Sequence, residues 1–225
     1  MPLEPRLIET AVPDDPEGLV LVLHGGAARR PATAVSPTQL SVVRMIPIAR
    51  RIARTGEGRL AVYRLLNSQR GWDVGHTPVD DARWALDEVA RRLGTALPTC
   101  LVGHSLGGRA TLLTAGHPAV RSAAALAPWV YPDDDPPGLA GRRILVVHGD
   151  RDRVALADRS LAVARTMGRT TEVGYVTIRG GKHAMLGHHD RFDGLAAEFA
   201  ATTLLARRPE GVLARIAAGE LQVEV

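Results

Sequence analysis

The stretch Pro98-Thr99-Cys100-Leu101-Val102-Gly103-His104-Ser105-Leu106-Gly107-Gly108-Arg109-Ala110-Thr111-Leu112-Leu113 decides the fold. Its first five residues form a short apolar run typical of a buried strand, and residues 109–115 favour a helix. Between them stands Gly-x-Ser-x-Gly, which at a sharp strand-to-helix turn presents its serine as an exposed nucleophile. The flanking glycines lack the side chains that would collide in so tight a turn. The motif could arise by chance in a chain with 23 glycines, but the strand and helix around it favour a nucleophilic Ser105.

Three other apolar runs also end in residues that suit this chemistry. The first, 19–23, ends in His24-Gly25-Gly26-Ala27. The second, 144–147, ends in His148-Gly149-Asp150-Arg151-Asp152. The third, 173–178, is followed by Gly180-Gly181-Lys182-His183. Strands that alternate with helices indicate a mostly parallel sheet, and sites in such sheets gather beyond the carboxyl ends of the strands, where all four motifs fall.

With these motifs in this order, the chain resembles the α/β-hydrolase family, whose triad follows the order Ser, acid, His. The resemblance covers about residues 17–206. It implies an α/β fold with a mostly parallel central sheet and helices on both faces. Only residues 128–143 separate the strand at 122–127 from the acid strand, so we expect no cap domain. The layout is similar to that of dienelactone-hydrolase-like esterases, but true dienelactone hydrolases have a cysteine nucleophile, so their substrate does not carry over.

The resemblance implies a catalytic triad of Ser105, Asp152 and His183. Asp150 is a close rival for the acid, although an aspartate at this place often shapes a turn through hydrogen bonds to the backbone. The sequence favours a solvated loop for Asp133, Asp134 and Asp135. His188 and His189 are rivals for the base but stand at the start of the next helix. Three other histidines lack the context of a catalytic base and are interpreted as surface or packing residues: His76, His117 and His148.

The same resemblance implies an oxyanion hole made by the N–H of Leu106 and that of Gly26, with Ala27 as the next choice. We expect four residues around the substrate, His24 chiefly as an anchor of its turn: His24, His104, Trp72 and Trp129. Residues 27–38 are expected beside the site as well. Arg29 and Arg30 could meet an acidic group there, but a solvent-facing role is favoured. No metal and no cofactor is implied.

The 225 residues are expected to form one domain, 1–225, because no stretch resembles a linker. Beyond residue 208 the pattern leaves two alternatives for 209–225: an edge strand at 221–225 or a loose tail. Cys100 is the only cysteine and is expected to pack in the core. The chain is expected to contain helices at 39–54, 80–93, 109–115, 156–167 and 195–205, and strands at 6–12, 19–24, 60–66, 98–102, 122–127, 144–149 and 173–178.

Charge and hydropathy exclude other classes of protein. The formal net charge is +4, but the arginines are scattered among acids and no aromatic platform for bases accompanies them, so no nucleic-acid partner is expected. No apolar run is long enough to cross a membrane. The first residues lack the basic start and apolar core of a signal peptide, so we expect a cytoplasmic protein.

The sequence therefore predicts a serine hydrolase that cleaves a small carboxylic ester through an acyl-enzyme. Thioesterase, lactonase and amidase activities use the same residues and stay open, as does a perhydrolase or haloperoxidase side activity. The alternative from another class is a non-catalytic binding protein with a hydrolase fold.

Overall fold

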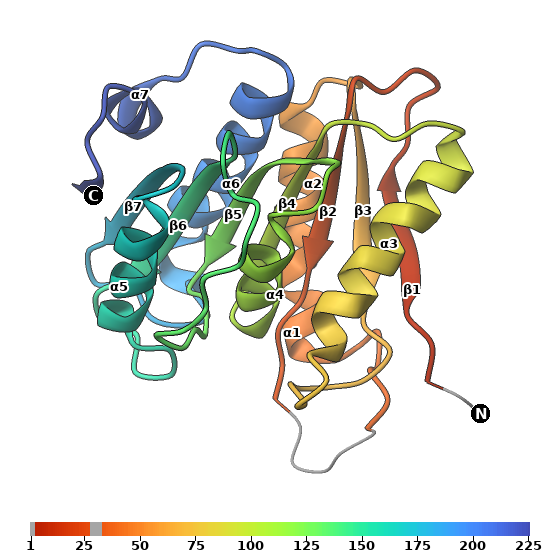
Figure 1. The fold of residues 1–225 in the computed structure, drawn as a ribbon, viewed down its shortest axis with the longest axis horizontal. Coiled ribbons are helices and arrows are strands. Elements are labelled where there is room, and N and C mark those ends of the chain that lie inside the picture. Colours follow the sequence, from red (N-terminus) through yellow and green to blue (C-terminus); the bar gives the residue numbers. More distant parts are fainter. Residues whose placement is uncertain (1–2, 28–32) are drawn as a thin grey trace.

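The computed structural model describes residues 3–27 and 33–225, and these form an eight-stranded sheet (Figure 1). The strands lie in the order β1-β3-β2-β4-β5-β6-β7-β8. Only β1 runs antiparallel, against β3, and every other neighbouring pair is parallel. The bounds are β1 Arg6–Ala11, β2 Gly18–Leu23, β3 Leu60–Leu66, β4 Thr99–His104, β5 Val120–Leu126, β6 Arg143–Gly149, β7 Glu172–Ile178 and β8 Gln222–Glu224.

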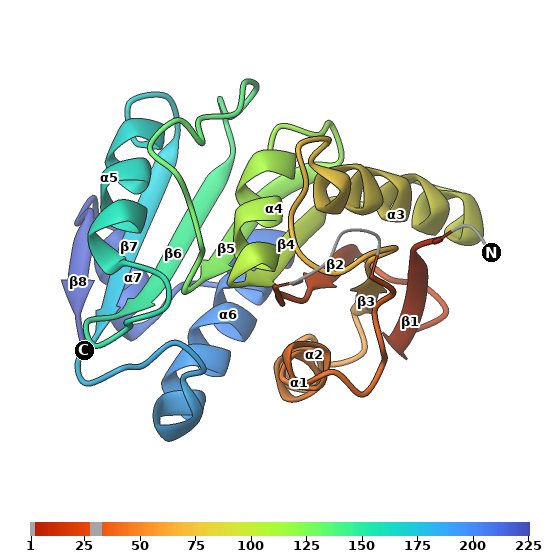
Figure 2. The same cartoon turned by 90° about the horizontal axis from the view of Figure 1, so that it is seen from below.

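Helices cover both faces of the sheet (Figure 2). One face carries α3 (Thr77–Leu93), α4 (Leu106–Thr114) and α5 (Ala157–Met167). The other carries α2 (Met45–Thr55) and α6 (His189–Leu204), preceded by the short α1 (Leu40–Val43) and the 3-10 turn η1 (Leu186–His188), and α7 (Gly211–Ala217) adds Leu213 to the same core. The fold is therefore a three-layer α/β sandwich.

The two cores follow from the alternation of side chains along each strand. In β2, Val20 and Val22 pack beneath α2 and α6, whereas Leu19 and Leu21 pack beneath α3 and α4. All six residues of β2 are buried, which suits a central strand of a parallel sheet covered on both faces.

The expected elements form, with differences at their ends. Helix α3 begins at Thr77 rather than Asp80, because Pro78 occupies a position in the first turn that needs no N–H donor. Helix α6, to which 195–205 was assigned, begins at His189, at the place expected for His188 and His189. Helix α7 was not predicted. Of the two alternatives for the last residues, the structure contains the edge strand: β8 pairs in parallel with β7 through Val176 and Val223.

The order of the strands creates one place where ligands bind in such sheets. β3 and β4 lie on opposite sides of β2, so the order in which the strands are added to the sheet reverses at β2. In such sheets this reversal creates a crevice beyond the carboxyl ends of the two strands, here β2 and β4. Between β5 and β6, residues 127–142 contain no helix and no strand, as expected for a fold without a cap domain. No helix in the described part of the chain is long and apolar enough to cross a membrane.

Candidate active site

Ser105 stands in a strained turn between β4 and α4. Its backbone has φ 58° and ψ −121°, a conformation that non-glycine residues rarely adopt. Its N–H donates to the carbonyl of Leu126 at 2.9 Å. A Cβ on Gly107 would lie 2.5 Å from the carbonyl oxygen of Leu23, so glycine at this position lets the turn approach the end of β2. The turn holds Ser105 at the carboxyl end of the sheet with only 8 % of its surface exposed.

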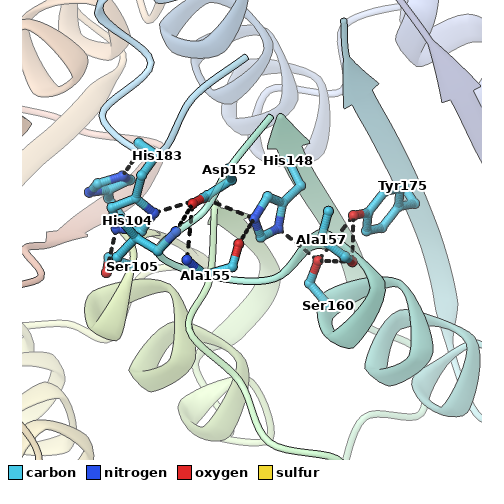
Figure 3. A network of polar contacts seen from close by, with 10 residues as sticks. His104, Ser105, His148, Asp152, Ala155, Ala157, Ser160, Tyr175 and His183 are labelled. Carbon is cyan, nitrogen blue, oxygen red and sulfur yellow. Dashed lines mark hydrogen bonds and ion pairs between the residues drawn. The ribbon is translucent and has the colours of Figure 1, made fainter. Parts of the chain in front are cut away.

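His183 connects Ser105 to Asp152 (Figure 3). Its Nε2 lies 3.0 Å from the Ser105 hydroxyl, and its Nδ1 lies 2.7 Å from Oδ2 of Asp152. The residues come from the loops after β4, β7 and β6, so the sheet brings together side chains that are 78 and 31 residues apart. Since Asp152 can only accept while ionised, Nδ1 carries the proton and Nε2 faces the serine as an acceptor.

The Asp152 carboxylate is fully surrounded by donors. Oδ1 accepts the N–H groups of Val154 at 2.8 Å and Ala155 at 3.0 Å, while Oδ2 accepts from His183 and His148. Burial raises the pKa of this carboxyl, but the hydrogen bonds from His148, His183 and the two amides outweigh burial and hold the pKa well below its ordinary value. Asp152 is therefore ionised at any pH at which the protein would work.

Of the two alternatives for His148, surface or packing, the structure contains the buried one, but the sequence did not predict its contact with Asp152. This side chain is completely buried, and its Nε2 lies 3.1 Å from Oδ2 of Asp152 and 3.0 Å from the carbonyl of Ala155. Because both neighbours accept, Nε2 carries a proton. Its Nδ1 lies 2.7 Å from the Ser160 hydroxyl, which lies 3.0 Å from that of Tyr175 (Figure 3). The network reaches from the sheet interior to the active site.

The rivals for the acid and the base lie elsewhere. Asp150 is exposed and accepts the N–H of Gly180 at 2.7 Å, which ties the loop after β6 to the turn after β7. His188 and His189 lie at η1 and the start of α6, and neither has a hydrogen bond to Ser105 or Asp152 in the described residues.

The expectation of a solvated loop at Asp133, Asp134 and Asp135 was wrong for Asp134. This residue is buried and forms a bidentate ion pair with Arg109, at 2.8 Å for the closest pair of atoms. A buried carboxylate needs such a partner, and Arg109 on α4 provides it.

Two side chains hold the loop that carries His183. His104 Nε2 lies 2.9 Å from the carbonyl oxygen of His183 and must donate to it. Burial, followed by the charge of His183, lowers the pKa of His104 to about 3, so its ring is neutral. Arg44, which the sequence did not single out, donates to the carbonyl of Ala184 at 3.0 Å and pairs with Asp193 at 2.8 Å. Asp193 is buried and only 9 % of the Arg44 side chain is exposed, which makes this contact a fixed support of the loop.

The turn after β2 packs directly against Ser105. A Cβ on Gly25 would lie 2.8 Å from the carbonyl oxygen of His104 and 2.9 Å from Cβ of Ser105. Gly26 has φ 121°, which favours glycine. His24 accepts the N–H of Asn67 at 3.2 Å, so its Nδ1 donates to the carbonyl of Gly25 at 2.7 Å. His24 anchors the turn, as the sequence indicated.

A cavity of about 480 Å³ opens above Ser105. Trp129 and His104 line it, as do the predicted oxyanion residues Gly26, Ala27 and Leu106. Trp72 is not among its lining residues. Instead the Arg109 guanidinium lies 4.1 Å from the centre of the Trp72 ring. Arg29 and Arg30, for which a solvent-facing role was favoured, lie outside the described residues, as does the part 28–32 of the segment 27–38.

No family model and no curated protein matches the chain. Solved structures do match it. A serine α/β-hydrolase without a lid from Xanthomonas campestris is 18 % identical with a TM-score of 0.66, over 93 % of this chain and 99 % of that one. Est1E from Butyrivibrio proteoclasticus with bound ferulic acid is 16 % identical with a TM-score of 0.64, over 90 % and 96 %. The esterase domain of a Rhodothermus marinus protein is 15 % identical with a TM-score of 0.60, over 88 % and 97 %. With these similarities and its own sheet order, the chain has the α/β-hydrolase fold.

Proposed function

We propose that this protein is a serine hydrolase that cleaves small carboxylic esters through an acyl-enzyme. The observation that carries the proposal is the hydrogen-bonded series Ser105–His183–Asp152 at the base of an apolar cavity. An unperturbed serine hydroxyl is a weak nucleophile, and a base in contact with it is what activates it.

The steps follow from the tautomer of His183, in which Nδ1 carries the proton and Nε2 is free to accept one. His183 Nε2 takes the proton of Ser105 as Oγ bonds to the ester carbonyl carbon, and Asp152 stabilises the imidazolium formed. His183 then returns the proton to the leaving oxygen as its bond to carbon breaks. Water, deprotonated by the same nitrogen, attacks the acyl-enzyme, releases the acid and restores Ser105.

The negative charge on the carbonyl oxygen needs donors. The N–H of Leu106, at the first turn of α4, has no partner within its helix and is one candidate. Gly26 is the second and Ala27 the next, because both line the cavity beside Ser105. Trp129 and His104 are the proposed substrate contacts on the other walls. Each oxyanion donor is worth about 10² to 10³ in rate.

The same residues would also cleave a thioester, a lactone or an amide. For each of these bonds, the open cavity favours substrates with small acyl groups. The alternative from another class, a binding protein without activity, is disfavoured because all three residues of the triad are present and in contact.

The experiment is active-site labelling. A fluorophosphonate should modify the protein once, at Ser105, with the site identified by mass spectrometry of peptides. Ser105→Ala and His183→Ala should each abolish labelling and reduce ester hydrolysis to a similar residual rate, because triad members act as a unit. Ser36→Ala, at an exposed serine, is the control and should label normally. A folded wild-type protein that stays unlabelled and hydrolyses no activated ester would refute the proposal.

A further inference from the structure

A second cavity adjoins the one above Ser105. It has a volume of about 780 Å³ and is lined by the loop after β6 and the loop after β7, His183 included. Val154, His183 and Ala184 line both cavities. The two cavities are therefore neighbours that meet around His183.

The first of these cavities has an apolar rim. Four large aliphatic residues around it are exposed to solvent, three of them by more than half of their surface: Leu40 at 85 %, Leu186 at 70 %, Val154 at 53 % and Val43. Aliphatic side chains gathered in this way around a reactive serine suit an apolar acyl group.

The second cavity, in contrast, is lined by cations. Arg151, Arg153 and Lys182 are exposed, and none of them has an ion-pair partner within the described residues. Two carboxylates also line this cavity. Asp150 is exposed and accepts the N–H of Gly180, and Asp152 is buried with all its donors satisfied. The exposed charge is therefore three cations against one carboxylate, a net attraction for an anion.

The chemistry of the triad assigns one half of the substrate to each cavity. The nitrogen that activates Ser105 also protonates the leaving oxygen, so the leaving group must lie beside Nε2 of His183. The carbonyl oxygen faces the N–H of Leu106 on the opposite side, and the acyl group lies in the apolar cavity. A leaving group that extends from Nε2 along Val154 and Ala184, which line both cavities, would meet Lys182 and Arg153 in the second one.

We propose that the substrate is an ester or thioester with an apolar acyl group and a leaving group that carries a carboxylate or a phosphate. This inference rests on the proposed function. The three cations act on the bound leaving group through space, and the reaction is the hydrolysis described above, with the proton of Ser105 delivered to the departing oxygen or sulfur.

The test compares three aryl esters whose leaving groups differ in charge, with each kcat/KM divided by the rate of alkaline hydrolysis of the same ester: phenyl butyrate, 3-carboxyphenyl butyrate and 3-(trimethylammonio)phenyl butyrate. At about 0.01 M salt, kcat/KM should be about tenfold higher for the anionic ester than for the neutral one, and lowest for the cationic ester. The preference should shrink at about 0.5 M salt, where exposed charges are screened within a few ångströms. S-butyryl pantetheine and S-butyryl 4′-phosphopantetheine make the same comparison for phosphate.

Charge reversal identifies the residues responsible. Arg151→Glu/Arg153→Glu should lower the ratio of kcat/KM between the anionic and the neutral ester by about tenfold or more. The control, Arg169→Glu/Arg208→Glu, makes the same change of net charge at exposed arginines that line neither cavity and should leave the ratio unchanged.

Equal kcat/KM for all charges at low salt, or an equal change of the ratio in the control, would overturn the inference. A preference for either anion supports it, and the pantetheine pair tells whether phosphate is the anion. Hydrolysis of phenyl butyrate that requires Ser105 tests the proposed function separately, so the failure of one is distinguishable from the failure of the other.

Discussion

His148 and His183 donate to the same oxygen of Asp152, Oδ2, at 3.1 and 2.7 Å. One ring belongs to the candidate active site and the other to the interior of the sheet. Since the two amide N–H groups of the following turn hold the other oxygen, the carboxylate has no freedom to rotate. The orientation of His183 is therefore set by contacts that extend well beyond the three residues that would perform the reaction.

Asp152→Asn should lower kcat by about three to four orders of magnitude while the protein stays folded, because an amide cannot hold the required tautomer of His183. Asp150→Asn is the matched control. It should cost about 1 kcal/mol of unfolding free energy through its bond to Gly180, with kcat little changed. Steady-state kinetics and urea denaturation measure both. The reverse pattern in two folded proteins would transfer the role of the acid to Asp150.

His148→Leu should lower kcat about tenfold and leave KM nearly unchanged, since it removes one of the four hydrogen bonds to Asp152 without touching the cavity. His148→Gln can still donate and should recover part of the loss. Tyr175→Phe is the control for disturbance of the buried network: it should cost about 1 kcal/mol of stability and keep kcat within about twofold. If Tyr175→Phe lowers kcat as much as His148→Leu does, the effect of His148 is structural rather than positional.

The sequence was sufficient to predict the parts of the site that are local. The glycines around Ser105 are its neighbours in the chain, and Asp152 and His183 follow closely after β6 and β7. The rules for parallel sheets then place these three residues together. The contact between His148 and Asp152 was not predicted, because it depends on how α5 and the loop before it pack over β6. No pattern within the strand of His148 indicates that packing.

Contacts between residues far apart in the sequence could not be predicted for the same reason. Arg44 and Asp193 are 149 residues apart, and an arginine on one helix gives no sign of the aspartate that it will meet on another. Asp134 lies among acids and prolines, a pattern typical of a solvated loop, yet its ion pair with Arg109 allows it to be buried. Helix α7 is only seven residues long and is stabilised by packing against the core rather than by its own pattern.

The pH dependence of stability should report on His104. Its pKa in the folded protein is about 3, below the ordinary 6.5, so between these values the unfolded chain binds the proton more readily. Stability is therefore full above about pH 6.5 and falls by about 1.4 kcal/mol for each pH unit below it. His104→Gln should reduce this slope by about 1.4 kcal/mol per pH unit, the contribution of one proton. Urea denaturation between these pH values measures the slope. His24, whose pKa burial also lowers, is present in both proteins and does not affect the comparison.

Without a cap, the cavity above Ser105 cannot enclose a long acyl chain. Among 4-nitrophenyl esters, kcat/KM should be highest from acetyl to hexanoyl and fall for longer chains. The described residues include no helical lid that could open at a lipid–water interface, so the rate on a short-chain triglyceride should pass smoothly through its solubility limit. A jump in rate at that limit, or a preference for emulsified long-chain triglycerides, would contradict this expectation.

The close approach of the β4–α4 turn to β2 makes Gly107 sensitive to any side chain. Its Cβ would lie 2.5 and 2.6 Å from the carbonyl oxygens of Leu23 and His24, which belong to the backbone and cannot rotate away. Gly107→Ala should therefore cost about 3 kcal/mol of unfolding free energy, at the upper end for overpacking, or prevent folding altogether.

Gly75→Ala is the control, because the nearest atoms to its Cβ would be those of the Asp73 carboxylate at 4.0 Å, an ordinary contact. It should change stability by no more than about 0.5 kcal/mol. Gly25→Ala covers the case in which Gly107→Ala does not fold. Its Cβ would press on Cβ of Ser105 at 2.9 Å, so a folded variant should lose fluorophosphonate labelling. Normal stability of Gly107→Ala together with normal labelling of Gly25→Ala would mean that the turn is not packed against β2 as described.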